Sequence, residues 1–121
     1  MAVERARRPA QQVEIGVVGR CQDLGEILGL RLGDQVQRAL VQRLKPANQN
    51  LRDLGVKQAP FVVLIGASMP SVLAEVAFIT NDQEGRLLKG TNYRQRIAEA
   101  LFTAVQRYQS SLTDRKSTRL N

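Results

Sequence analysis

The sequence predicts an α/β fold, as part of a three-layer sandwich in which helices flank a twisted, mostly parallel sheet. Apolar residues recur at helical spacing in two separate stretches, residues 23–44 and 91–108. Between them, residues 59–79 carry a single charge, and their β-branched and aliphatic runs are typical of strands covered on both faces. The chain has 121 residues, of which 43% are apolar, so one domain with a real core is expected.

The first helical stretch is built on a row of apolar residues four apart. The row is Leu24, Leu28, Leu32, Val36, Leu40 and Leu44. Three glycines lie in its first half, and glycine lowers helix stability, so we expect the firm helix to begin with Asp34 as its N-cap. It should end before Pro46, since proline cannot be carried through a helix. Residues 46–57 are then expected to form a polar loop.

Two apolar runs marked by prolines are the expected strands. They are residues 61–65 and residues 72–78. A buried helix is the competing interpretation, but Pro60 and Pro70 precede the runs too closely for one. Residues 13–18 are compatible with another short strand.

Two helices are expected after the strands. Asn81 followed by Glu84 is the spacing of a capping box, so a short helix should start there and close at Gly90. Thr91 or Asn92 should cap a long last helix. The expected buried stripe of that helix is Tyr93, Ile97, Leu101, Val105 and Tyr108.

The two ends of the chain differ from its middle. Residues 1–22 show no clear period and are expected to be poorly ordered or foreign to the domain, which should comprise residues 23–112. Residues 113–121 are expected to be a tail derived from a sequencing adapter, with an ordinary polar tail as the alternative. Without the residues from Asp114 on, which hold three basic residues and one acidic one, the net charge falls from +7 to +5.

The composition excludes several classes of function. The sequence has no histidine, and its one cysteine is Cys21, so a histidine triad, a histidine zinc site or a disulfide framework cannot be built from it alone. Ser68 and Ser71 therefore have no histidine to activate them as nucleophiles. No apolar run is long enough to span a membrane, and Met1 is not followed by the apolar segment of a signal peptide.

Glu75 departs from its surroundings, because it is the one charge in an apolar run and an ionised carboxylate is costly to bury without a partner. One interpretation places it at the carboxyl end of a strand, where α/β sheets open onto a binding crevice. There a carboxylate can take a proton from water and return it to a leaving amine. The other interpretation is structural: Glu75 reaches solvent past the sheet or pairs with Lys57. The residues alone leave both open.

From Gly55 onward the sequence resembles the zinc-dependent N-acetylmuramoyl-L-alanine amidases of bacterial cell-wall remodelling, the amidase type 3 family. The matching motifs are Gly55-Val56-Lys57, Phe61-Val62-Val63-Leu64, Met69-Pro70-Ser71-Val72-Leu73-Ala74-Glu75, Phe78-Ile79-Thr80-Asn81 and a closing helix from Tyr93. The ordered set spans residues 32–108. Ile65 departs from the family, since many members have a basic residue there.

The resemblance implies a hydrolase that cuts the amide bond between N-acetylmuramic acid and the L-alanine of the stem peptide in peptidoglycan. The family's glutamate that matches Glu75 is a catalytic carboxylate beside a zinc-bound water. The zinc ligands, two histidines and a glutamate, lie in the family's N-terminal half. This chain is therefore expected to be a C-terminal fragment that binds no zinc and is inactive alone. Its parent enzyme would act in the cell envelope, in the periplasm or outside the cell.

Two other functions compete with this one. A small basic module could bind an anionic polymer through Arg5, Arg7 and Arg8, and such binding should weaken with salt. Nucleic acid is not the expected partner, because the basic residues scatter over several helices and stacking aromatics are missing. The third possibility is a degenerate relative that only packs against partners, in which Glu75 is structural. The oligomeric state is not indicated.

Overall fold

The computed structural model describes residues 12–17, 24–58, 64 and 68–119, and it describes the side chains of residues 29–57, 64 and 68–114. The elements follow the order β1 (Gln12–Val17), α1 (Leu24–Leu44), β2 (Arg52–Gln58), β3 (Val72–Glu75), α2 (Asp82–Lys89) and α3 (Thr91–Arg119). Helices and strands are mixed along the chain, so the predicted α/β class is confirmed.

The three strands form one sheet in the order β2-β1-β3. β1 pairs with β2 in parallel and with β3 in antiparallel orientation, so one of the two described pairs departs from a parallel sheet. The short strand expected at residues 13–18 is present as β1, in the centre of the sheet. The strand expected at residues 61–65 lies outside the described residues except for Leu64, which is buried.

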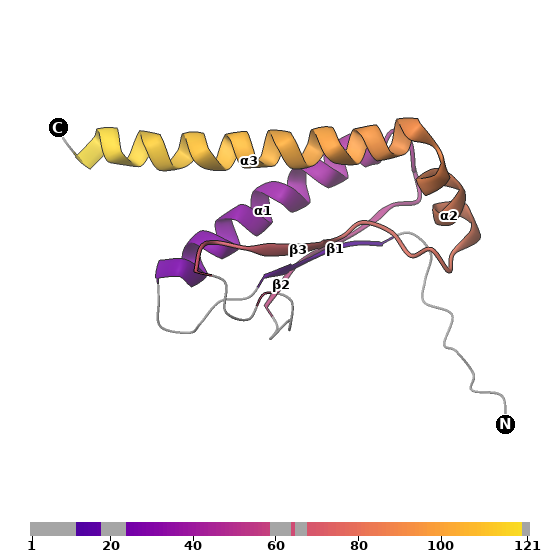
Figure 1. Cartoon of the computed structure of the whole chain (residues 1–121), viewed down its shortest axis with the longest axis horizontal. Helices are drawn as coiled ribbons and strands as arrows, with labels where there is room; N and C mark the ends of the chain where they lie inside the picture. The colour runs from indigo at the N-terminus through magenta and orange to yellow at the C-terminus, as the bar shows by residue number, and fades with distance from the viewer. Residues whose placement is uncertain (1–11, 18–23, 59–63, 65–67, 120–121) are drawn as a thin grey trace, which may run out of the picture.

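α1 and α3 stack on one side of this sheet, and α2 lies beyond the end of the strands (Figure 1). α1 packs against all three strands, and α3 packs on α1 and α2. α1 thus lies between the sheet and α3, which Figure 1 shows as the long helix along the top. Among the described elements, none of the helices covers the second face of the sheet.

The core lies where α1 meets α3. The buried cluster contains Val36, Ala39, Leu40, Leu44, Leu51, Tyr93, Ala100 and Ala104. Ala100 and Ala104 are fully buried, and their small side chains let the two helix axes approach closely. The expected stripe on α3 is wrong at Val105, which is 45% exposed, because α1 packs along the neighbouring alanines instead.

Two further expectations about the first half of the chain are wrong. α1 begins at Leu24, ten residues before Asp34, whose carboxylate instead pairs with Arg38 at 3.0 Å one turn later. Gly29 and Gly33 are buried in this helix, so packing outweighs the low helix propensity of glycine. The expected polar loop over residues 46–57 is also wrong, because β2 begins at Arg52.

The short helix α2 forms as its capping signature predicts. The Asn81 side chain accepts a hydrogen bond from the Glu84 backbone N–H at 3.0 Å. The helix closes at Gly90, whose N–H donates to the carbonyl of Leu87, but the φ of Gly90 is −76° and not left-handed. α3 follows at once and continues to Arg119, past the boundary expected at residue 113.

Candidate functional site

Glu75 is the last residue of β3, and its side chain is exposed. Its Cα is paired with that of Glu14 in β1. Because β3 runs antiparallel to β1, this end of β3 lies towards the beginning of β1, away from the carboxyl ends of β1 and β2. The carboxylate therefore lies at a strand end and reaches solvent, which is compatible with both interpretations of the sequence. It lies at the other edge of the sheet from the crevice of a parallel α/β fold.

Glu75 faces the side of the sheet that α1 does not cover. Side chains alternate along a strand, and Val72 and Ala74 pack against the core under α1. Leu73 and Glu75 therefore face the opposite side. The same alternation on β2, where Val56 packs inward, places Lys57 on the side of Glu75.

The backbone of β1 separates Lys57 from this part of β3. In the register of the sheet, Gly16 lies between Lys57 of β2 and Leu73 of β3, and Glu75 lies two residues beyond Leu73. Gly16 has no side chain, so the middle position of this row carries none. We call the surface formed by Lys57, Gly16, Leu73 and Glu75 the open face.

The segment that follows Glu75 is held at Phe78. The Phe78 backbone N–H donates to the Glu84 Oε2 atom at 2.6 Å, and the Phe78 carbonyl accepts from the Asn81 N–H at 2.9 Å. The Gly85 N–H donates to the Asn81 carbonyl at 2.8 Å. These hydrogen bonds hold the segment between β3 and α2 against the first turn of α2, at Phe78 in its middle and at Asn81 at its end.

Glu84 belongs to a buried polar cluster, which we define as Glu84, Tyr93 and Asn48. The three side chains come from α2, α3 and the turn after α1, and each is almost wholly buried. Burial raises the pKa of the Tyr93 phenol, the Glu84 charge raises it further, and the Asn48 side chain acts in the opposite direction. The capping-box spacing marks Glu84 in the sequence as a capping residue, whereas no local pattern marks Asn48.

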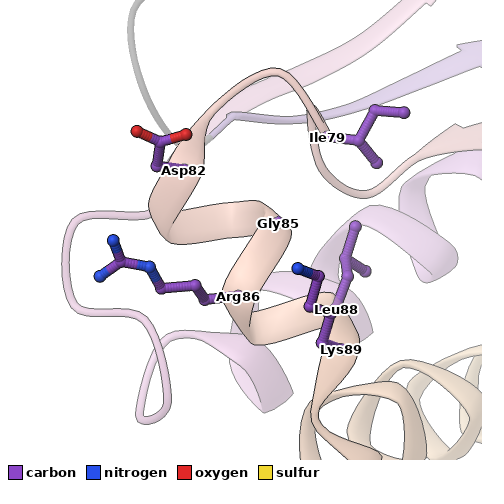
Figure 2. A pocket seen from close by; sticks show the side chains of 6 residues that line it. All are labelled: Ile79, Asp82, Gly85, Arg86, Leu88 and Lys89. Atoms are coloured by element: carbon purple, nitrogen blue, oxygen red, sulfur yellow. The ribbon is translucent and has the colours of Figure 1, made fainter.

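A hollow of about 470 Å³ lies on the outer side of α2. Figure 2 shows the six residues that line it: Ile79, Asp82, Gly85, Arg86, Leu88 and Lys89. Glu75 is not among them. The hollow is therefore separate from the open face, and its lining combines an aspartate with two basic residues and two aliphatic ones.

Neither serine singled out in the sequence is part of the open face. Ser68 is exposed and Ser71 half-buried, and the chain has no histidine to pair with either. Cys21, Ile65 and the basic cluster Arg5, Arg7 and Arg8 lie outside the described residues. None of the described helices is both long and apolar enough to cross a membrane.

The zinc that the resemblance implies does not fit the residues at hand. Zinc sites in proteins use three or four histidine, cysteine or carboxylate ligands. No group of three such residues lies close enough together in the described part of the chain, and the sequence contains no histidine.

The fold and the site together define an α/β protein with an exposed carboxylate, Glu75, on the open face. Next to it lies a loop that hydrogen bonds hold against α2. The family model of N-acetylmuramoyl-L-alanine amidase matches residues 29–107, well over half of the chain. The chain belongs to this family, which confirms the resemblance read from the motifs around Glu75.

Individual relatives agree with this assignment. AmiA, an N-acetylmuramoyl-L-alanine amidase of Escherichia coli K12, is 44% identical over 69 residues, which are 57% of this chain and 24% of AmiA. LytC of Bacillus subtilis 168 is 41% identical over 78 residues, 64% of this chain and 15% of LytC. The crystal structure of an amidase from Clostridium difficile 630 superposes with a TM-score of 0.69 at 25% identity, covering 87% of this chain and 53% of that one. The chain thus spans about half of the solved relative and less of these two curated ones.

Proposed function

We propose that this chain supplies the catalytic carboxylate of a peptidoglycan amidase, a hydrolase of the cell envelope. The bond cut joins N-acetylmuramic acid to the L-alanine of the stem peptide. One observation carries the proposal: the family match over residues 29–107 includes β3, and Glu75 is exposed at the end of that strand.

Glu75 acts as a general base and then as a general acid. Its carboxylate takes a proton from the water that attacks the amide carbonyl, and a C–O bond forms. It then gives that proton to the nitrogen of L-alanine as the C–N bond breaks. The products are a carboxylate on the lactyl group and a stem peptide with a free amino terminus.

The open face suits a polymeric substrate. Peptidoglycan is a network and cannot enter a closed cavity, so the reacting carboxylate has to be exposed. Gly16 lies in register between Lys57 and Leu73, and a glycine within a strand often marks a site where another backbone approaches closely. Lys57 adds a positive charge at the far side of this row.

Groups from outside these 121 residues complete the site. We propose that they include the family's zinc ligands, since the chain has no histidine, and that the chain alone is inactive. We also propose that the sheet continues beyond β2 and β3 in the complete domain, with helices on its second face, as in a three-layer sandwich. The substrate then binds along the edge of the sheet at which β3 ends, opposite to the carboxyl ends of β1 and β2.

A graft tests this function. Residues 29–107 replace the matching segment of E. coli AmiA, and the release of stem peptides from purified peptidoglycan is measured as new amino-terminal alanine. We expect the graft to release peptides, and AmiA without this segment and the 121-residue chain alone to release none. A graft that unfolds cooperatively yet releases no peptide would overturn the proposal.

A further inference from the structure

We propose that Glu84 is a positioning residue for Glu75: its buried carboxylate holds the backbone of Phe78 and thereby fixes the end of β3 and the direction of the Glu75 side chain. That Glu84 positions a catalytic group rests on the proposed function of Glu75. We call the hydrogen bond between Glu84 and Phe78 the clamp, and hydrogen exchange tests it independently of that function.

The clamp is a strong hydrogen bond. The distance from the Phe78 nitrogen to Glu84 Oε2 is 2.6 Å, and the acceptor is an ionisable carboxylate. Hydrogen bonds to a charged partner are shorter and roughly twice as strong as those between neutral groups. Glu84 is 1% exposed, so little water competes for the carboxylate.

Helix capping alone does not account for this contact. In a capping box the N3 carboxylate bonds to the backbone N–H of the N-cap residue. The N-cap here is Asn81, yet Glu84 reaches Phe78, three residues further back along the chain. The carboxylate therefore connects α2 to the segment that leaves β3, and does more than close the first turn of its own helix.

The distance along the chain makes the clamp relevant to Glu75. Phe78 is three residues from Glu75, and β3 has no further ladder partner after Glu75 in the described sheet. Beyond the last ladder pair, Val76 packs against the core cluster, and the clamp then holds the backbone by a hydrogen bond at Phe78. A loop free at Phe78 would let the end of β3 fray, and Glu75 would swing with it.

The packing behind the loop makes the clamp rigid. A Cβ atom on Gly85 would lie 3.3 Å from the Ile79 carbonyl oxygen, so α2 lies directly against the segment after Phe78. Beneath it, Tyr93 and Asn48 are buried beside Glu84. Burial of an ionisable carboxylate is unfavourable unless it is well bonded, and a glutamine or leucine would fill the volume at lower cost. The carboxylate at this position is explained by the hydrogen bond that it accepts from the Phe78 N–H.

Two variants and a matched control test the clamp in the 121-residue chain. Glu84→Gln keeps the size of the side chain and removes its charge, and Glu84→Asp keeps the charge and shortens the reach. Asp82→Asn is the control, because it removes an exposed carboxylate from the same first turn of α2. The measurement is amide hydrogen exchange at Phe78, with Leu40 in the core of α1 as the internal reference.

We expect Glu84→Gln to speed exchange at Phe78 about tenfold or more while Leu40 changes less than about twofold, as for local opening. Asp82→Asn should change neither rate. If Glu84→Gln does not unfold cooperatively, Glu84→Asp, whose shorter side chain weakens the contact, should still speed exchange at Phe78 relative to Leu40, by a smaller factor. Equal exchange at Phe78 in the wild type and the folded variant would overturn the clamp, and so would an equal increase at Phe78 and Leu40.

The AmiA graft tests the positioning of Glu75. Misplacement of a catalytic group by about 1 Å lowers turnover by up to about a hundredfold. Glu84→Gln in the graft should therefore lower kcat about tenfold or more with KM changed less than about twofold, and Glu84→Asp should restore part of it. Unchanged kcat with faster exchange at Phe78 would overturn the positioning role. An inactive wild-type graft would instead count against the proposed function, while the exchange result on the clamp would still hold.

Discussion

Arg43 of α1 donates a hydrogen bond to the Glu99 carboxylate of α3 over 2.7 Å, and this ion pair joins the two helices that form the core. The same guanidinium lies 3.4 Å from the Thr103 hydroxyl, and Arg96 donates to the Arg43 carbonyl at 3.2 Å. The polar contacts therefore run along one side of the α1–α3 packing and fix its register.

The contribution of this ion pair should be modest. The side chains of Arg43 and Glu99 are 42% and 45% exposed, so water screens their attraction. A double-mutant cycle of Arg43→Ala and Glu99→Ala should give a coupling of about 0.5–1 kcal/mol in the free energy of unfolding, decreasing at high salt. Urea unfolding at two salt concentrations measures it. A salt-independent coupling would show that the pair acts through packing and not through charge.

Substitution in the core should cost much more than substitution on the surface. Leu40 of α1 is fully buried in the core, whereas Phe102 of α3 is 65% exposed. We expect Leu40→Ala to lower the free energy of unfolding by about 2–5 kcal/mol. Phe102→Ala should change it by less than about 0.5 kcal/mol. Comparable losses in the two variants would contradict the packing of α3 on α1.

The N-cap of α2 should respond to the loss of its acceptor. The Asn81 side chain accepts the Glu84 N–H at 3.0 Å. Asn81→Ala is expected to destabilise the chain by about 1 kcal/mol, and Asn81→Ser, which retains an acceptor, by a few tenths. Thermal or urea unfolding of the three proteins measures the difference. Equal stability of the alanine and serine variants would argue that this hydrogen bond contributes nothing.

Stability should fall at alkaline pH, in part through Tyr93. Burial raises the pKa of its phenol above the ordinary value of 10.0, so the folded chain holds this proton more tightly than the unfolded chain. The contribution is present below pH 10.0 and is lost as the pH rises through the raised pKa. Tyr93→Phe should therefore lose less stability than the wild type between neutral and alkaline pH. The burial of Tyr108 also raises its pKa, which leaves the variant a residual slope. Parallel pH profiles for the two proteins would contradict the burial of an ionisable Tyr93.

Local signals in the sequence predicted those features that depend on neighbours along the chain. The cap at Asn81 and the end of α2 at Gly90 follow from residue types at fixed spacing, and the structure confirms them. The cap expected at Thr91 or Asn92 is wrong, because α3 begins at Thr91 and includes both residues. The motif around Glu75 likewise identified the family that the comparisons confirm. These patterns need no knowledge of the tertiary fold.

Other features could not be predicted because they depend on contacts between distant segments. Residues 52–58 contain four polar or charged side chains, and they form a strand because β1 pairs with them. α3 buries Ala104 and exposes Val105 because α1 approaches on that side. The burial of Glu84 likewise depends on Tyr93 and Asn48, which are brought to it by α3 and the turn after α1.

The measurement that tests the central claim most directly is the turnover of the AmiA graft carrying Glu75→Gln, compared with Asp82→Asn in the same graft. Glutamine keeps the size of the side chain but cannot accept the proton from water. We expect Glu75→Gln to lower kcat by at least about a hundredfold, with cooperative unfolding unchanged, because general acid–base catalysis contributes about 10²–10⁴-fold. Asp82→Asn should retain activity. Turnover of Glu75→Gln equal to that of the unaltered graft would contradict the assignment of Glu75 as the catalytic carboxylate.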